Sequence, residues 1–164
     1  MENSELFINM NEFDSISDKA GFVYCINCCE NSLKESNVKL TSPNNKKSAT
    51  FYKSKDKTIT LLAIENIIQQ KDCTRLNKKN HNFQSCDFGE NITTKGIDLS
   101  KLKVGDFVKV GNQLTLEIIK LGKNCYKYCS LYKESLGCVI SKEFIFCKVS
   151  NEGIVNVGDE IYVL

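Results

Sequence analysis

The chain has 164 residues, of which 41% are hydrophobic and 26% charged, and its formal net charge is +2. This composition is typical of a soluble globular domain, and so small a charge gives no support for nucleic-acid binding. The longest apolar run is far shorter than a membrane span, so we expect no membrane association. The polar, acidic start from Met1 to Ala20 contains no apolar signal segment, which predicts a cytoplasmic protein.

The chain contains nine cysteines, an odd number. An odd count without a signal segment argues against a secreted disulfide framework, so we expect reduced thiols. The length is sufficient for one domain that buries its own core without covalent cross-links. We therefore predict a single domain over residues 1–164.

The first half of the chain contains few clear elements. Phe22–Ile26 is a short apolar run that predicts a strand, and Lys34–Ser48, which holds the only proline, reads as a loop. A strand is expected at Thr58–Leu62, running into one short helix over Leu62–Gln70. Lys71–Gln84 is rich in charged and amide residues and is expected to be another loop.

The second half consists of short apolar runs separated by glycines. Gly111-Asn112 is a hairpin signal between two alternating runs. Many short strands with polar turns favour a closed or nearly closed β-barrel. Strands are predicted at Phe107–Val110, Leu114–Ile119, Phe144–Val149, Ile154–Val155 and Ile161–Leu164.

Several sequence blocks of this half follow one another in a recognisable order. They are Phe88-Gly89-Glu90-Asn91-Ile92-Thr93-Thr94, Leu102-Lys103-Val104-Gly105-Asp106, Gly122-Lys123-Asn124-Cys125, Gly137-Cys138-Val139-Ile140 and Val157-Gly158-Asp159-Glu160-Ile161. Together they resemble a small stand-alone MOSC domain of bacterial type, the domain named for the C-terminal part of molybdenum cofactor sulfurases. The resemblance is strong over residues 86–164.

The N-terminal part diverges from that family. An aspartate, a histidine and an arginine-glutamine pair usually precede the strand that begins here at Ile59, and this chain has Phe51–Lys57 instead. Phe144 stands at a position where the family has glycine, and Lys148 lies near a position where it has arginine. These departures concern cofactor binding more than the fold.

The resemblance implies a mainly β, MOSC-type barrel with one or two short helices, and an essential cysteine that carries sulfur or binds molybdenum. In the sulfurase setting, the resemblance implies partners: a pyridoxal-phosphate-dependent cysteine desulfurase that supplies persulfide sulfur, or other molybdenum cofactor biosynthesis proteins. In relatives that are molybdoenzymes, it implies a thiolate that binds the molybdenum of a molybdopterin cofactor and reduction of N-hydroxylated substrates.

Cys125 is the first candidate for this cysteine, both as catalytic thiol and as metal ligand. It matches the Gly-Lys-x-Cys block, and Lys123 and Lys127 lie within two residues of it. A nearby ammonium favours the thiolate, which attacks sulfur and binds soft metals. Cys129 is the second candidate. The alternative for Cys125 is a small buried hydrophobic residue.

Four residues are candidates for cofactor binding: Glu90, Asn91, Lys123 and Lys57. Asn91 would offer amide donors and acceptors to a pterin-like ring, although capping and turn formation are equally good uses for Glu90 and Asn91. Lys57, in a lysine-rich segment, would replace the phosphate-holding arginine with a point charge. The alternative for Lys57 is a solvated loop.

Two other interpretations remain open. A structural zinc site would combine Cys25, Cys28 and Cys29 with Cys125 and Cys129. A binding or adaptor module would keep the barrel and lack cofactor binding, in agreement with the missing upstream anchors. The sequence does not decide between an enzyme and a non-catalytic module.

Overall fold

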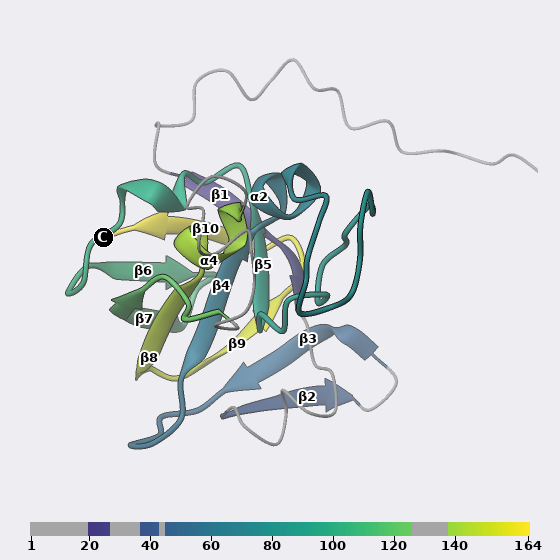
Figure 1. Ribbon diagram of the computed structural model, residues 1–164. Coiled ribbons are helices and arrows are strands. Elements are labelled where there is room, and N and C mark those ends of the chain that lie inside the picture. Colours follow the sequence, from purple (N-terminus) through teal and green to yellow (C-terminus); the bar gives the residue numbers. More distant parts are fainter. Residues whose placement is uncertain (1–19, 27–36, 43–44, 126–137) are drawn as a thin grey trace, which may run out of the picture.

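The computed structural model describes residues 20–26, 37–42, 45–125 and 138–164. A β-barrel forms the centre of this part of the chain (Figure 1). Two short helices lie at one end of the barrel, and a small separate sheet lies at the other. None of the described helices is long and apolar enough to cross a membrane.

Seven strands form the closed barrel, in the spatial order β1-β10-β6-β7-β8-β4-β5. Neighbours pair antiparallel except β4 and β5, which are parallel. Closure pairs every barrel strand on both sides, which confirms the predicted β-barrel. The strands are β1 (Ala20–Ile26), β4 (Ile59–Ala63), β5 (Ile92–Lys95), β6 (Phe107–Val110), β7 (Leu114–Leu121), β8 (Ile145–Asn151) and β10 (Glu160–Val163).

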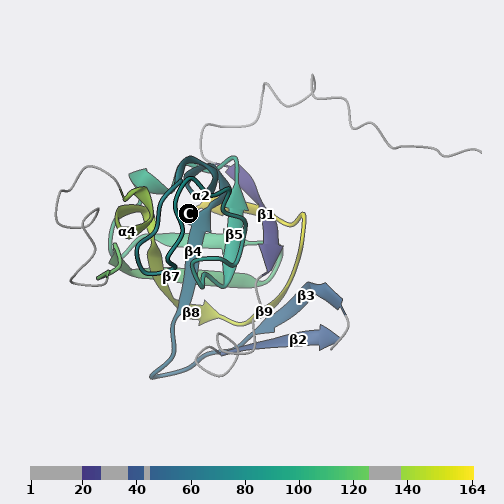
Figure 2. The ribbon, with the colours of Figure 1, turned by 45° about the vertical axis from the view of Figure 1, so that its right-hand side comes forward.

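A three-stranded sheet lies beside the barrel, in the order β2-β3-β9 (Figure 2). It consists of β2 (Val38–Ser42), β3 (Asn45–Phe51) and β9 (Gly153–Asn156). The prediction of a loop over Lys34–Ser48 is therefore wrong. The polar β3 is a strand because it pairs with β9, with Ser48 opposite Asn156. This partner is distant in the sequence, so the residues of β3 alone give no signal for a strand.

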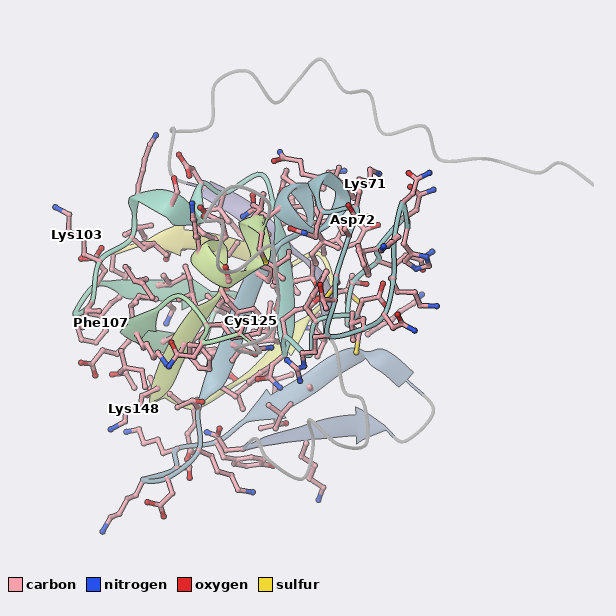
Figure 3. All side chains as sticks on the ribbon, viewed as in Figure 1. Lys71, Asp72, Lys103, Phe107, Cys125 and Lys148 are labelled. Carbon is pink, nitrogen blue, oxygen red and sulfur yellow. The ribbon has the colours of Figure 1, made fainter. Side chains whose placement is uncertain are left out.

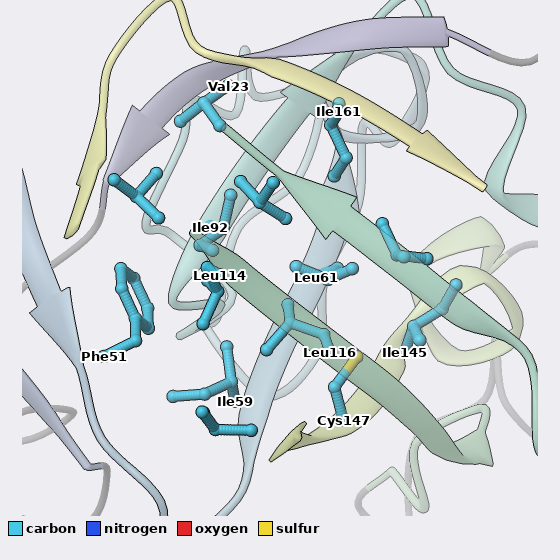
Figure 4. Packing of buried hydrophobic residues seen from close by; sticks show 14 of the residues in the cluster. Val23, Phe51, Ile59, Leu61, Ile92, Leu114, Leu116, Ile145, Cys147 and Ile161 are labelled. Carbon is cyan, nitrogen blue, oxygen red and sulfur yellow. The ribbon is translucent and has the colours of Figure 1, made fainter. Parts of the chain in front are cut away.

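The barrel interior is filled by apolar side chains from all seven strands (Figure 4). Along β7, Leu114, Leu116 and Ile118 are buried and alternate with more exposed residues, as a half-buried strand requires. Phe51 of β3 is fully buried in the same cluster, near Ile59 and Leu114 in Figure 4. The small sheet is thus joined to the barrel through a shared core.

A second apolar cluster covers the outer face of β4. This strand is buried along its whole length, because Ile59, Leu61 and Ala63 belong to the barrel core while Leu62 packs outside it. Helix α2 (Ile64–Gln69) confirms the predicted helix, whereas α4 (Val139–Glu143) is too short for its period to be read from sequence. The second cluster consists of Leu62, Ile64, Ile67, Phe83, Phe88, Ile140 and Phe144.

Candidate functional site

The turn after β7 holds the predicted thiol region against α4. Gly122 has φ of 78°, a left-handed conformation that favours glycine. Its N–H donates to the Phe144 carbonyl over 2.8 Å, and the Lys123 N–H donates to the Ser141 carbonyl over 2.7 Å. Residues 122 and 123 are therefore fixed to α4 and to Phe144, the residue that connects it with β8.

The Lys123 ammonium is held by two contacts. Its Nζ donates to the Phe88 carbonyl over 3.0 Å and lies 4.4 Å from the centroid of the Phe144 ring. Burial lowers the pKa of Lys123, and the charge of Arg75 lowers it further. Negative charge on Cys125, Glu90 or Cys73 acts in the opposite direction. The ammonium thus lies at the centre of a group of ionisable side chains.

Cys125 is half-buried and lies within electrostatic reach of Lys123. Figure 3 shows Cys125 near the centre of that view, apart from Lys103 and Lys148 at its edge. The structure therefore brings together the thiol and the lysine that the sequence singled out. The catalytic and metal-binding roles of Cys125 stay predictions. Cys129 and Lys127 lie outside the described residues.

Glu90 and Asn91 connect the preceding loop to β4. Glu90 is fully buried, and its Oε1 accepts hydrogen bonds from the Cys86 N–H over 2.7 Å and the Thr93 hydroxyl over 2.9 Å. Asn91 Oδ1 accepts from both the N–H and the hydroxyl of Thr60, each over 3.0 Å. These bonds fix the loop that presents the Phe88 carbonyl to Lys123.

We expect Glu90→Gln to gain stability relative to the wild type as the pH rises. Burial raises the pKa of Glu90 above its ordinary value of 4.5, so the native state binds this proton more tightly than the unfolded chain. The protonated Glu90 side chain contributes stability that is fully present below pH 4.5 and is lost as the pH rises through its pKa in the folded state. The glutamine side chain stays neutral, so the variant keeps its stability over the same range. Urea unfolding from pH 4 to pH 8 measures the difference.

The exposed Glu160→Gln serves as the control for this titration. Its unfolding free energy should follow the wild-type curve across the pH range. A Glu90→Gln curve parallel to the wild type would contradict the assignment of a buried, proton-favouring carboxyl.

Lys57 is not brought into this group. It is exposed in the loop between β3 and β4, where its N–H donates to the Ser54 hydroxyl over 3.2 Å. Lys57 is also absent from the main groups whose charge acts on Lys123. Its predicted cofactor-binding role therefore gains no support from its position.

Sequence reasoning missed three residues around Lys123. Cys73 and Arg75 come from Lys71–Gln84, which was expected to be a loop, and Phe144 comes from the end of α4. Arg75 is the only arginine in the chain, which is the one signal that pointed to it. The proximity of all three depends on tertiary packing.

The other described cysteines have varied environments. Cys147 lies in the barrel core, and burial raises the pKa of its thiol well above the usual range, whereas Cys25 and Cys138 are free and half-buried. Cys86 is disulfide-bonded, which corrects the expectation that all thiols are reduced.

The zinc alternative gains no support within the described ranges, where no three metal-binding side chains converge. It also needs Cys28, Cys29 and Cys129, which lie outside those ranges.

The architecture is that of a small β-barrel domain with a lysine-flanked thiol at the end of one strand. The family model of the MOSC domain matches residues 65–162. This match covers more than half of the chain, so the chain belongs to the MOSC family, which is associated with molybdenum cofactor-related function.

Two solved structures are similar to this chain. YiiM from Geobacillus stearothermophilus has 20% identity and a TM-score of 0.47, over 65% of this chain and 53% of that one. The YuaD protein from Bacillus subtilis has 19% identity and a TM-score of 0.47, over 89% of this chain and 84% of that one. The chain thus spans about half the length of the YiiM structure. A search of curated proteins found no match.

Glu90 and Asn91 do not fit the role of pterin contacts. A pterin ring needs accessible hydrogen-bonding groups along its edge, but both side chains are buried, and Glu90 Oε1 and Asn91 Oδ1 accept hydrogen bonds from Cys86, Thr93 and Thr60.

Proposed function

We propose that this MOSC protein carries sulfur for molybdenum cofactor chemistry as a persulfide on Cys125. The supporting observation is the Lys123 ammonium, which is held by the Phe88 carbonyl and the Phe144 ring two residues before Cys125 in the sequence. A neighbouring ammonium favours the thiolate, and the thiolate is the form that attacks sulfur.

The sulfur donor in this proposal is the persulfide of a pyridoxal-phosphate-dependent cysteine desulfurase. The Cys125 thiolate attacks the outer sulfur of the donor persulfide. A new sulfur-sulfur bond forms on Cys125, the sulfur-sulfur bond of the donor breaks, and the donor thiolate leaves with the electron pair. The proton of the outer sulfur stays with it, so atoms and electrons balance.

The proposed acceptor is a molybdenum centre or a protein that assembles it, and the proposed setting is the cytoplasm. In this role Lys123 has two tasks. Its charge favours the attacking thiolate, and it then favours ionisation of the persulfide that results, which releases the proton of the outer sulfur to water. Its hydrogen bond to Phe88 keeps it in place through both stages.

The test uses the purified chain with a cysteine desulfurase and cysteine, followed by measurement of protein-bound sulfane sulfur, molybdenum and pterin per chain. The proposal predicts sulfane sulfur approaching one atom per chain. Stoichiometric molybdenum and pterin without sulfur loading would overturn it in favour of the metal-ligand role. Absence of all three would overturn it in favour of a non-catalytic module.

A further inference from the structure

Gln70, which directly follows α2, is a buried polar residue at the junction of three segments. It is 3% exposed. Its Nε2 donates to the Asp72 carbonyl over 2.7 Å, and its Oε1 accepts from the Val139 N–H over 2.9 Å. A buried amide costs free energy unless its polar atoms are paired. These two hydrogen bonds offset that cost and join α2, the loop after it and the start of α4.

For α4, Gln70 takes the place of a capping residue. Val139 is the first residue of this helix, and the preceding Cys138 forms no side-chain capping hydrogen bond. The first N–H groups of a helix have no partner inside it, and a helix of five residues has little stability of its own. The Gln70 side chain therefore supplies, from a distant segment, a partner that α4 needs.

The other end of α4 holds Lys123. The Ser141 carbonyl accepts from the Lys123 N–H over 2.7 Å, and the centroid of the Phe144 ring lies 4.4 Å from the Lys123 Nζ. The Phe144 N–H in turn donates to the Ile140 carbonyl over 3.2 Å, so the position of this ring depends on the helix. Hydrogen bonds and the helix itself thus connect Gln70 with Lys123.

We propose that Gln70 is a positioning residue for the thiol site, because it fixes the start of α4 and thereby holds Lys123 in place two residues before Cys125. The inference rests on the proposed sulfur-carrier function and adds to it a residue that acts through α4. Without the Gln70 hydrogen bond, α4 is held less firmly and the ammonium is less well fixed. The Cys125 thiolate is then favoured less strongly.

The experiment measures the rate at which iodoacetamide alkylates Cys125 in the full chain between pH 6 and pH 10. Gln70→Met keeps the length of the side chain and removes the acceptor of the Val139 N–H. This variant should raise the pH of half-maximal rate by about half a unit, so that alkylation at pH 7 is about threefold slower. A loss of stability alone would lower the free energy of unfolding in urea and leave this pH unchanged.

Val139→Pro removes the same hydrogen bond from its other partner. Proline has no N–H and is tolerated at the first position of a helix, and Cys138 already has the extended backbone that suits a residue before proline. Both single variants and the double variant should show the same shift, because each loses the same hydrogen bond. Gln69→Met, an exposed change at the end of α2, should keep the wild-type value.

A wild-type pH of half-maximal rate in Gln70→Met or Val139→Pro would overturn the positioning role. Shifts that add in the double variant would also overturn it, since they would come from separate effects. Alkylation of wild-type Cys125 that is no faster than that of the half-buried Cys138 would instead overturn the proposed function.

Discussion

Cys125→Ser should reduce desulfurase-dependent loading of sulfane sulfur to background. Serine has nearly the size of cysteine and the half-buried position tolerates a hydroxyl, so the fold should persist. A hydroxyl cannot carry a persulfide, and the Lys123 ammonium would then have no thiolate beside it. The measurement is sulfane sulfur per chain after incubation with a cysteine desulfurase and cysteine.

Cys138→Ser is the matched control for this experiment. Cys138 is half-buried and not disulfide-bonded, and its side chain forms no capping hydrogen bond at the start of α4. Loss of this thiol should therefore leave the sulfane sulfur per chain near the wild-type level. Equal loading of Cys125→Ser and the wild type would mean that another thiol carries the sulfur. Cys129 would then be the next residue to change.

Phe51→Ala should lower the free energy of unfolding by about 3–5 kcal/mol. The ring is fully buried in the barrel core although its strand belongs to the small sheet. Removing it leaves a cavity near Ile59 and Leu114 at the junction of the two sheets (Figure 4). Denaturant unfolding followed by circular dichroism measures the loss.

Tyr52→Ala provides the comparison, since the next residue is 41% exposed on the other face of the chain. Its cost should stay below about 1 kcal/mol. Similar losses at both positions would show that Phe51 does not join the small sheet to the barrel core.

The barrel strands could be predicted where the alternation of apolar and polar residues in the sequence reflects the burial of one face. β7 alternates along its length because one face meets the core and the other meets solvent, and β6 matches its predicted range. The polar β3 could not be predicted, because its stability comes from pairing with β9. Helix α4 was missed because five residues are too few to show a helical period.

The candidate site was predictable on one side only. Cys125 and Lys123 are neighbours in the sequence, so their block predicted a thiol beside an ammonium. Arg75 acts on Lys123 from a distant loop that packs through Cys73 and Leu76, and no local pattern predicts this packing. Phe144 supplies the ring beneath the Lys123 ammonium, a contact that no local pattern predicts.

Site-resolved labelling of the cysteines at neutral pH tests the central claim most directly. The native protein is treated briefly with a limiting amount of iodoacetamide, and mass spectrometry of its peptides gives the labelled fraction of each cysteine that is not disulfide-bonded. The account predicts that Cys125 is labelled first, ahead of the half-buried Cys25 and Cys138, and that the core residue Cys147 is labelled last. Labelling of any other cysteine ahead of Cys125 would contradict it.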